Sequence, residues 1–130
     1  MTMRWDCRDK GCYLNKSMWD WAIFDGCFGD TRVKPTDVDG LVERNGHFLL
    51  IETKGDSVGG LNRGQHITYK QAANLGRVTV LVLYGHRNNP TRMTVIAPGG
   101  DVTVYKDCTL EDVRAFVRRW WAAANGIEAA

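Results

Sequence analysis

The sequence has few of the features that would set it apart from an ordinary globular protein. Its 130 residues include only three prolines, and they contain no internal repeat, no low-complexity tract and no linker rich in proline and serine. A hydrophobic fraction of 44% and a charged fraction of 25% are close to the averages for soluble proteins. We therefore expect a single domain over residues 1–130 that buries its own core without disulfides.

A long hydrophobic run is also lacking. The longest apolar stretch, residues 78–84, is interrupted by Thr79 and is far too short to cross a bilayer. The N-terminal segment MTMRWDCRDKGC is charged and has no apolar core of a signal peptide. These features predict a cytoplasmic protein with no membrane partner, in which the four cysteines are reduced thiols.

Neither sign of charge is in clear excess, because the formal net charge is only +2. This balance excludes a basic tail or a histone-like protein that covers nucleic acid with its whole surface. Any nucleic-acid binding must therefore depend on positive charge that is gathered on one face or in a few loops.

One short helix is predicted in the first part of the chain. Ser17 and Asp20 form a capping-box pattern at its start, with Trp19, Ile23 and Phe24 expected on its buried side.

The remaining elements follow from the spacing of apolar and turn-forming residues. Strands are expected at about residues 36–44 and 47–54, then a helix at about 62–75 and a third strand at about 77–84. A second hairpin over residues 92–97 and 101–106 and a final helix capped by Thr109 complete the order. Helices and strands that alternate in this way predict the mixed α/β class.

The first two strands are joined by Asn45-Gly46, the strongest short-range signal for a hairpin. A type I′ turn needs a positive φ at both central residues, and these two residue types tolerate it. The two-residue turn fixes the register, because Arg44 then faces His47 and each later pair follows from that one.

Counted along this register, Asp39 faces Glu52 and Asp37 faces Lys54, and all four side chains project from the same face of the hairpin. Two carboxylates directly opposed on a sheet repel each other unless a cation lies between them. Apolar residues flank these acids on both faces of both strands, and buried strands rarely carry charges without a partner or a function. The pair therefore indicates a site for a divalent metal, with Lys54 beside it to orient or deprotonate a water.

The segments PTDVDGLVE and FLLIETK resemble the core signature of the PD-(D/E)XK nucleases. Asp39 matches the aspartate of that signature, Glu52 the second acidic residue and Lys54 the lysine. The resemblance implies that the carbonyl of Thr53 is a further metal ligand and that the cofactor is Mg²⁺ or Mn²⁺. It also implies a restriction-endonuclease-like core, a mixed central sheet flanked by helices, here with an extra C-terminal hairpin and helix.

A second motif is similar to the RecB-like branch of the superfamily, including its small phage-encoded members. Gln65 and Tyr69 have the Q-x-x-x-Y spacing of that branch and share one face of the predicted helix, so they are expected to point toward the acids. That branch often has a glutamate on its first helix, whereas the first glutamate here is Glu43. Asp20 or Asp25 could replace it, which leaves open whether the site holds one metal or two.

These residues together predict a metal-dependent nuclease that hydrolyses phosphodiester bonds in DNA, cutting at particular structures or ends rather than at particular sequences. Residues expected to contact the substrate backbone are Lys70, Arg87 and Arg92. Arg114, Arg118 and Arg119 on the last helix are further basic candidates, although a solvated polar face explains them as well.

Three alternatives stay open. The chain could be a nuclease-fold protein without turnover, either a nucleic-acid accessory or a phage protein that blocks a host factor. It could also be an interaction protein stabilised by zinc, with Cys7, Cys12, Cys27 and Cys108 as ligands, although their spacing is loose. Five tryptophans, among them Trp121 outside the main apolar stripe of the last helix, leave a homodimer open as well.

Overall fold

The computed structural model describes residues 21–55 and 59–126 of the chain. The chain divides into two compact units, residues 1–37 and 38–130, which are described separately below.

The described part of the first unit holds one short turn of 3₁₀ helix, η1 (Trp21–Phe24). The ring of Trp21 stacks on that of Phe24 with their centroids 6.2 Å apart, and the Trp21 Nε1–H donates a hydrogen bond of 2.7 Å to Asp37. Ile23 and Phe24 are exposed, so the prediction that they form the buried side of a helix is wrong. The predicted start of that helix at Ser17 lies outside the described residues.

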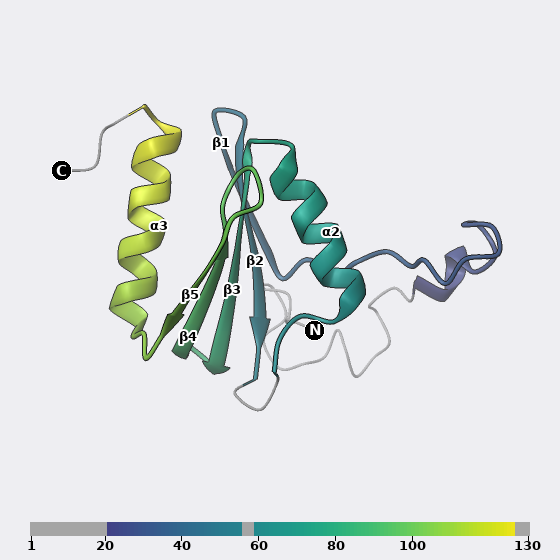
Figure 1. Cartoon of the computed structure of the whole chain (residues 1–130), viewed down its shortest axis with the longest axis horizontal. Coiled ribbons are helices and arrows are strands. Elements are labelled where there is room, and N and C mark those ends of the chain that lie inside the picture. Colours follow the sequence, from purple (N-terminus) through teal and green to yellow (C-terminus); the bar gives the residue numbers. More distant parts are fainter. Residues whose placement is uncertain (1–20, 56–58, 127–130) are drawn as a thin grey trace. The chain divides into compact units, whose positions relative to one another are not determined.

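The second unit is built on a five-stranded sheet whose strands lie side by side in chain order (Figure 1). These strands are β1 (Gly40–Arg44), β2 (His47–Lys54), β3 (Val78–His86), β4 (Asn89–Ile96) and β5 (Val102–Lys106). β2 and β3 are parallel, whereas every other neighbouring pair is antiparallel. The mixed α/β class predicted from the sequence is confirmed.

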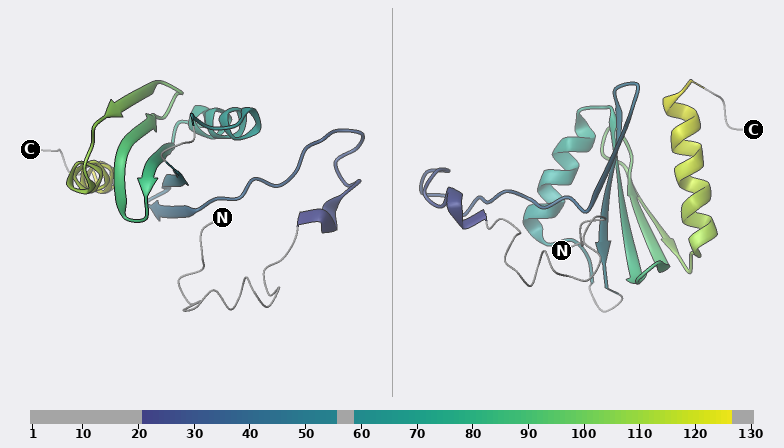
Figure 2. Two further views of the ribbon diagram at one scale, coloured as in Figure 1. Left: turned by 90° about the horizontal axis from the view of Figure 1, so that it is seen from below. Right: turned by 180° about the vertical axis from the view of Figure 1, so that it is seen from behind.

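Two helices cover opposite faces of this sheet (Figures 1 and 2). α2 (Arg63–Asn74) forms the crossover that the parallel pair requires, and α3 (Leu110–Ala124) follows β5. Asn62 caps α2 by accepting a hydrogen bond from the Gln65 N–H, and Thr109 caps α3 in a capping box. No helix among the described residues is long and apolar enough to span a bilayer.

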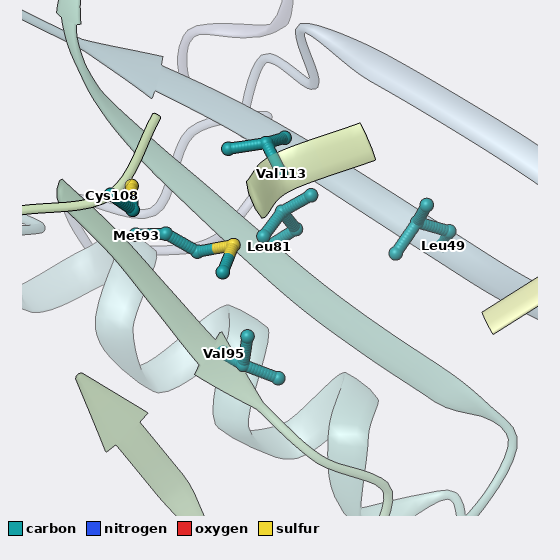
Figure 3. Packing of buried hydrophobic residues seen from close by; sticks show 6 residues of the cluster. All are labelled: Leu49, Leu81, Met93, Val95, Cys108 and Val113. Atoms are coloured by element: carbon teal, nitrogen blue, oxygen red, sulfur yellow. The ribbon is translucent and has the colours of Figure 1, made fainter. Parts of the chain in front are cut away.

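The core has two parts because successive side chains of a strand point to opposite faces. The cluster on the α3 side contains Leu49, Leu81, Met93, Val95, Cys108 and Val113 (Figure 3). The cluster on the α2 side contains Tyr69, Ala73, Val80, Val82, Tyr84 and Ile96. β3 contributes to both clusters and is therefore the central buried strand.

The first hairpin has the predicted turn and register but a shorter first strand. Asn45 and Gly46 adopt φ angles of 51° and 79°, and the pairs run from Arg44 with His47 to Gly40 with Ile51. The ladder ends there, so the expected cross-strand pairs of Asp39 with Glu52 and of Asp37 with Lys54 are not formed. β1 is also an exposed edge strand, which corrects the expectation that both strands are buried on both faces.

The connection between the strands predicted at about residues 77–84 and 92–97 is a tight turn between two longer strands. β3 continues to His86 and β4 already begins at Asn89, so only Arg87 and Asn88 connect them. Arg92 is therefore a strand residue, and its position is fixed by the sheet rather than by a loop.

The tip of the first hairpin contacts the C-terminal end of α3. The Arg44 guanidinium lies 4.8 Å from the centre of the Trp121 ring and donates to the Asn125 side chain at 2.6 Å. The Asn45 side chain donates to the carbonyl of Ala124 at 3.1 Å. Although Trp121 remains 44% exposed, a contact within the chain thus accounts for its place outside the main stripe of the helix.

The two-sided burial of β3 gives a first prediction. Leu81→Ala removes a fully buried side chain and should lower the free energy of unfolding by about 2–5 kcal/mol. The same substitution at Leu41, which is 58% exposed on β1, should cost no more than about 0.5 kcal/mol. Urea unfolding of the two variants measures both values, and similar losses at the two positions would contradict the assigned core.

Candidate active site

Glu52 is a carboxylate buried near the end of β2, on the face that α2 covers. The residue is only 5% exposed, and a buried carboxylate is strongly unfavourable unless it is paired and hydrogen-bonded. Three side chains provide that compensation. The Tyr69 hydroxyl donates to Oε2 at 2.9 Å, the Gln65 amide donates to Oε1 at 3.1 Å, and the Lys54 Nζ lies 3.5 Å from Oε1.

Local periodicity explains why these side chains meet. Lys54 follows Glu52 by two positions along β2 and therefore shares its face of the sheet. Gln65 and Tyr69 lie one turn apart on α2 and point from that helix toward the sheet. The structure thus brings three predicted site residues together around Glu52, as the helical spacing indicated, while their catalytic roles remain predictions.

Asp39 lies directly before β1 and binds the end of β2 by its side chain. Its Oδ2 accepts hydrogen bonds from the backbone N–H of Thr53 at 2.8 Å and from the Thr53 hydroxyl at 2.9 Å. A carboxylate thus takes the backbone donor that a further rung of the ladder would have used, which is why β1 starts at Gly40. The hydrogen bonds that Thr53 donates to Asp39 were not predicted. The one sequence signal for them is that Thr53 lies between the motif residues Glu52 and Lys54.

The Thr53 carbonyl is placed on the same side of β2 as Asp39. The Phe48 N–H bonds to the Arg77 carbonyl on the β3 side, and backbone groups alternate sides along a strand. The N–H and C=O groups of Thr53 therefore both face the β1 side, where the ladder has ended. Asp39 and the Thr53 carbonyl lie along one edge, next to the residue that carries the Glu52 side chain.

Carboxylate and carbonyl oxygens are the ligand types that a hard divalent cation prefers. Mg²⁺ takes oxygen ligands and is typically held by one or two carboxylates plus waters and substrate phosphates. Among the described residues, no group of three or more acidic, histidine or cysteine side chains could hold a metal ion. Asp39, Glu52 and the Thr53 carbonyl, two carboxylates and one backbone oxygen, are the candidate ligands in the second unit.

One buried oxygen acceptor beside Glu52 also suits a bound water or cation. The Oε1 atom of Gln65 has no hydrogen-bond partner within the described residues, although its amide nitrogen binds Glu52. An unsatisfied buried acceptor costs about 1–3 kcal/mol, which a water or a cation at this position would recover. The site therefore has unused oxygen acceptor capacity next to its carboxylate.

The other acidic candidates belong to the first unit or lie outside the described residues. Asp25 and Asp37 belong to the first unit, where Asp37 accepts the hydrogen bond from Trp21. Asp20 lies outside the described residues. The second unit thus contributes two candidate carboxylates, Asp39 and Glu52, and the number of metal ions stays a prediction.

The predicted substrate-contacting residues lie in three different places. Lys70 lines an open cavity of about 390 Å³ with His66, Asn74 and Gly100. Arg87 lies in the turn between β3 and β4, and Arg92 lies over the ring of Tyr84. Separately, Arg114 and Arg118 both pair with Glu111 on the exposed surface of α3, which favours a solvated polar face there.

The cysteines give no support to a zinc site in the described residues. Cys108 is buried in the α3-side cluster, where burial raises the pKa of its thiol. Zinc binds the thiolate, so this environment suits a core side chain better than a ligand. Cys27 is exposed in the first unit, and Cys7 and Cys12 lie outside the described residues.

Comparison with known proteins finds no matching protein family, no matching curated protein and no matching solved structure. The arrangement around Glu52 must therefore be interpreted on its own geometry.

The hydrogen bond from Tyr69 to Glu52 gives a second prediction. Tyr69→Phe should lower the free energy of unfolding by about 1.5–3 kcal/mol, because it removes a buried donor to a charged group. Tyr105→Phe, at a residue 43% exposed, is the matched control and should change it by no more than about 0.5 kcal/mol.

A double-mutant cycle makes this test specific. In a Glu52→Gln background the effect of Tyr69→Phe should shrink, since the charged acceptor has gone. An undiminished effect in that background would show that the hydroxyl stabilises the protein through some other contact.

Proposed function

We propose that this protein is a metal-dependent nuclease that hydrolyses phosphodiester bonds in DNA, with Glu52 at the centre of its active site. The observation that carries the proposal is the buried Glu52 carboxylate, held by Lys54, Gln65 and Tyr69 beside the Asp39–Thr53 edge. A buried ionic cluster is weak evidence for a stabilising role, because apolar residues often replace such clusters without loss of stability. A catalytic role gives a reason for this one.

Asp39, Glu52 and the Thr53 carbonyl are the groups that would hold the Mg²⁺ or Mn²⁺ ion. When bound, such an ion polarises a phosphoryl oxygen and makes water a better nucleophile at neutral pH. The chain's contribution is to fix the ligands before substrate arrives. The two hydrogen bonds from Thr53 hold Asp39, and those from Gln65 and Tyr69 hold Glu52.

Lys54 is the side chain suited to act on the substrate. Its ammonium nitrogen lies 3.5 Å from Glu52 Oε1, and the side chain keeps 19% of its surface exposed. From there it can donate to a phosphate oxygen or orient the attacking water. Preorganised positive charge at a phosphoryl group stabilises the charge that develops in the transition state. Gln65 and Tyr69 are positioning residues, because they act through Glu52.

A catalytically silent binding protein with a nuclease-like site is the second candidate. The observation that favours it is that Glu52 already has three donors among the described side chains and is compensated without a cation. Such a protein would act as a nucleic-acid accessory or as a phage factor that blocks a host protein. It predicts DNA or protein binding with no strand cleavage in Mg²⁺ or Mn²⁺.

A cleavage assay on duplex, single-stranded and branched DNA separates the two candidates. We expect cleavage that depends on Mg²⁺ or Mn²⁺ and falls at least about 100-fold in Glu52→Gln and in Lys54→Gln. Glu111→Gln and Arg114→Gln, which remove the same kinds of charge from the exposed surface of α3, are the matched controls and should keep wild-type rates.

Cleavage that survives in both site variants would place the activity elsewhere. No cleavage of any of the three substrates by the wild-type protein would favour the binding protein.

A further inference from the structure

A row of side chains runs across the sheet from the Glu52 site toward the opposite edge. Lys54 on β2 is the register partner of Tyr84 on β3, Tyr84 is the partner of Arg92 on β4, and Arg92 is the partner of Lys106 on β5. Register partners lie side by side on the same face of a sheet. Three cations and one tyrosine therefore form a line perpendicular to the strands, on the face that α2 partly covers.

The far end of this row is open. The α2-side cluster takes residues from β2, β3 and β4, but none from β5 in the part of the chain that the structure describes. β5 is an edge strand and is exposed along its whole length, with Lys106 at its end (Figure 1). The row thus leads from the partly covered site at Lys54 onto an accessible surface.

The charge along this surface has one sign. On this face β3, β4 and β5, all within the described residues, carry no aspartate or glutamate. The neighbouring line of register partners runs from Glu52 through Val82 and Thr94 to Val104, so Glu52 itself is the nearest acid along the sheet. Within β3, β4 and β5 an extended polyanion along the row therefore meets no carboxylate, although Asp107 follows Lys106 directly beyond the end of β5.

Arg92 is held in a defined orientation within the row. Its guanidinium carbon lies 3.9 Å from the centroid of the Tyr84 ring, and Tyr84 is only 5% exposed. An arginine held against a buried ring has a restricted side chain, so it loses less conformational freedom when it contacts a phosphate.

The length of the row matches a short stretch of nucleic acid. Neighbouring strands lie about 4.8 Å apart, so the three steps from Lys54 to Lys106 span about 14 Å. Along the axis of a duplex one DNA strand carries a phosphate about every 3.4 Å, so a duplex axis parallel to the row would place about four phosphates of one strand over that length. Three cations opposite about four phosphates give the charge complementarity expected of a backbone contact.

We propose that Lys54, Arg92 and Lys106 form a track for the phosphate backbone of a DNA strand, which leads the strand across β3, β4 and β5 to the phosphate that is cleaved at Glu52. We call these three residues the cation row. The inference rests on the proposed function for the identity of the ligand, but it makes a separate claim about which surface binds it.

Binding measured without cleavage tests the cation row directly. Fluorescence anisotropy of labelled single-stranded and duplex oligonucleotides, in the absence of divalent metal, gives the affinity between about 50 and 200 mM salt. In the double variant Arg92→Gln with Lys106→Gln, the slope of log affinity against log salt should fall in magnitude by about 1.4–1.8, or 0.7–0.9 for each phosphate that is no longer neutralised. The two oligonucleotides show whether the track takes a single strand or a duplex.

The matched control removes two positive charges from the other face of the sheet. Arg114→Gln with Arg118→Gln, both on α3, should leave the slope at its wild-type value. Lys106→Gln alone changes only an exposed side chain, so it tests the track at a position where folding is not at risk, with an expected fall of about 0.7–0.9. An unchanged slope in the cation-row variants, or an equal fall in the α3 control, would overturn the proposal.

The outcomes also separate this proposal from the nuclease proposal. Binding with the expected slopes but no metal-dependent cleavage supports the cation row and contradicts the nuclease. Cleavage with slopes that the cation-row variants do not change supports the nuclease and overturns the track. A wild-type protein that binds neither oligonucleotide overturns the track as well.

Discussion

The burial of the Glu52 carboxylate is the constraint on which the rest of the site depends. A charge removed from water at the end of a buried strand must be compensated at short range, and each compensating group comes from a defined place in the fold. Lys54 comes from the same face of β2, and Gln65 and Tyr69 come from one face of α2. The site is thus made by docking the crossover helix onto the strand that precedes it.

The topology explains how this arrangement is tied to the core. β2 and β3 are parallel, so the chain must cross between them, and α2 forms that crossover. Tyr69 is fully buried between the helix and the sheet, where it both fills the α2-side core and donates to Glu52. A shift of α2 would therefore disturb the packing of the core and the compensation of the carboxylate together. The same central strand, β3, carries Tyr84, which lies between Lys54 and Arg92 in the cation row.

Much of this could be predicted from local patterns in the sequence. The turn at Asn45 and Gly46 gave the hairpin register, and helical spacing placed Gln65 and Tyr69 opposite Glu52, because both depend on short-range geometry. The end of β1 could not be predicted, since it depends on Asp39 bonding to Thr53 in place of a backbone partner. The strands predicted on either side of residues 85–91 stop short of them, whereas pairing between β3 and β4 extends both strands to His86 and Asn89.

The central claim is that Asp39 and Glu52 are ligands of one divalent cation. A crystal structure of the protein soaked with Mn²⁺, located by its anomalous scattering, tests it most directly. The account predicts a Mn²⁺ ion within coordination distance of both carboxylates and of the Thr53 carbonyl. Mn²⁺ bound only elsewhere, or no bound ion while Glu52 keeps its contacts with Lys54, Gln65 and Tyr69, would contradict it.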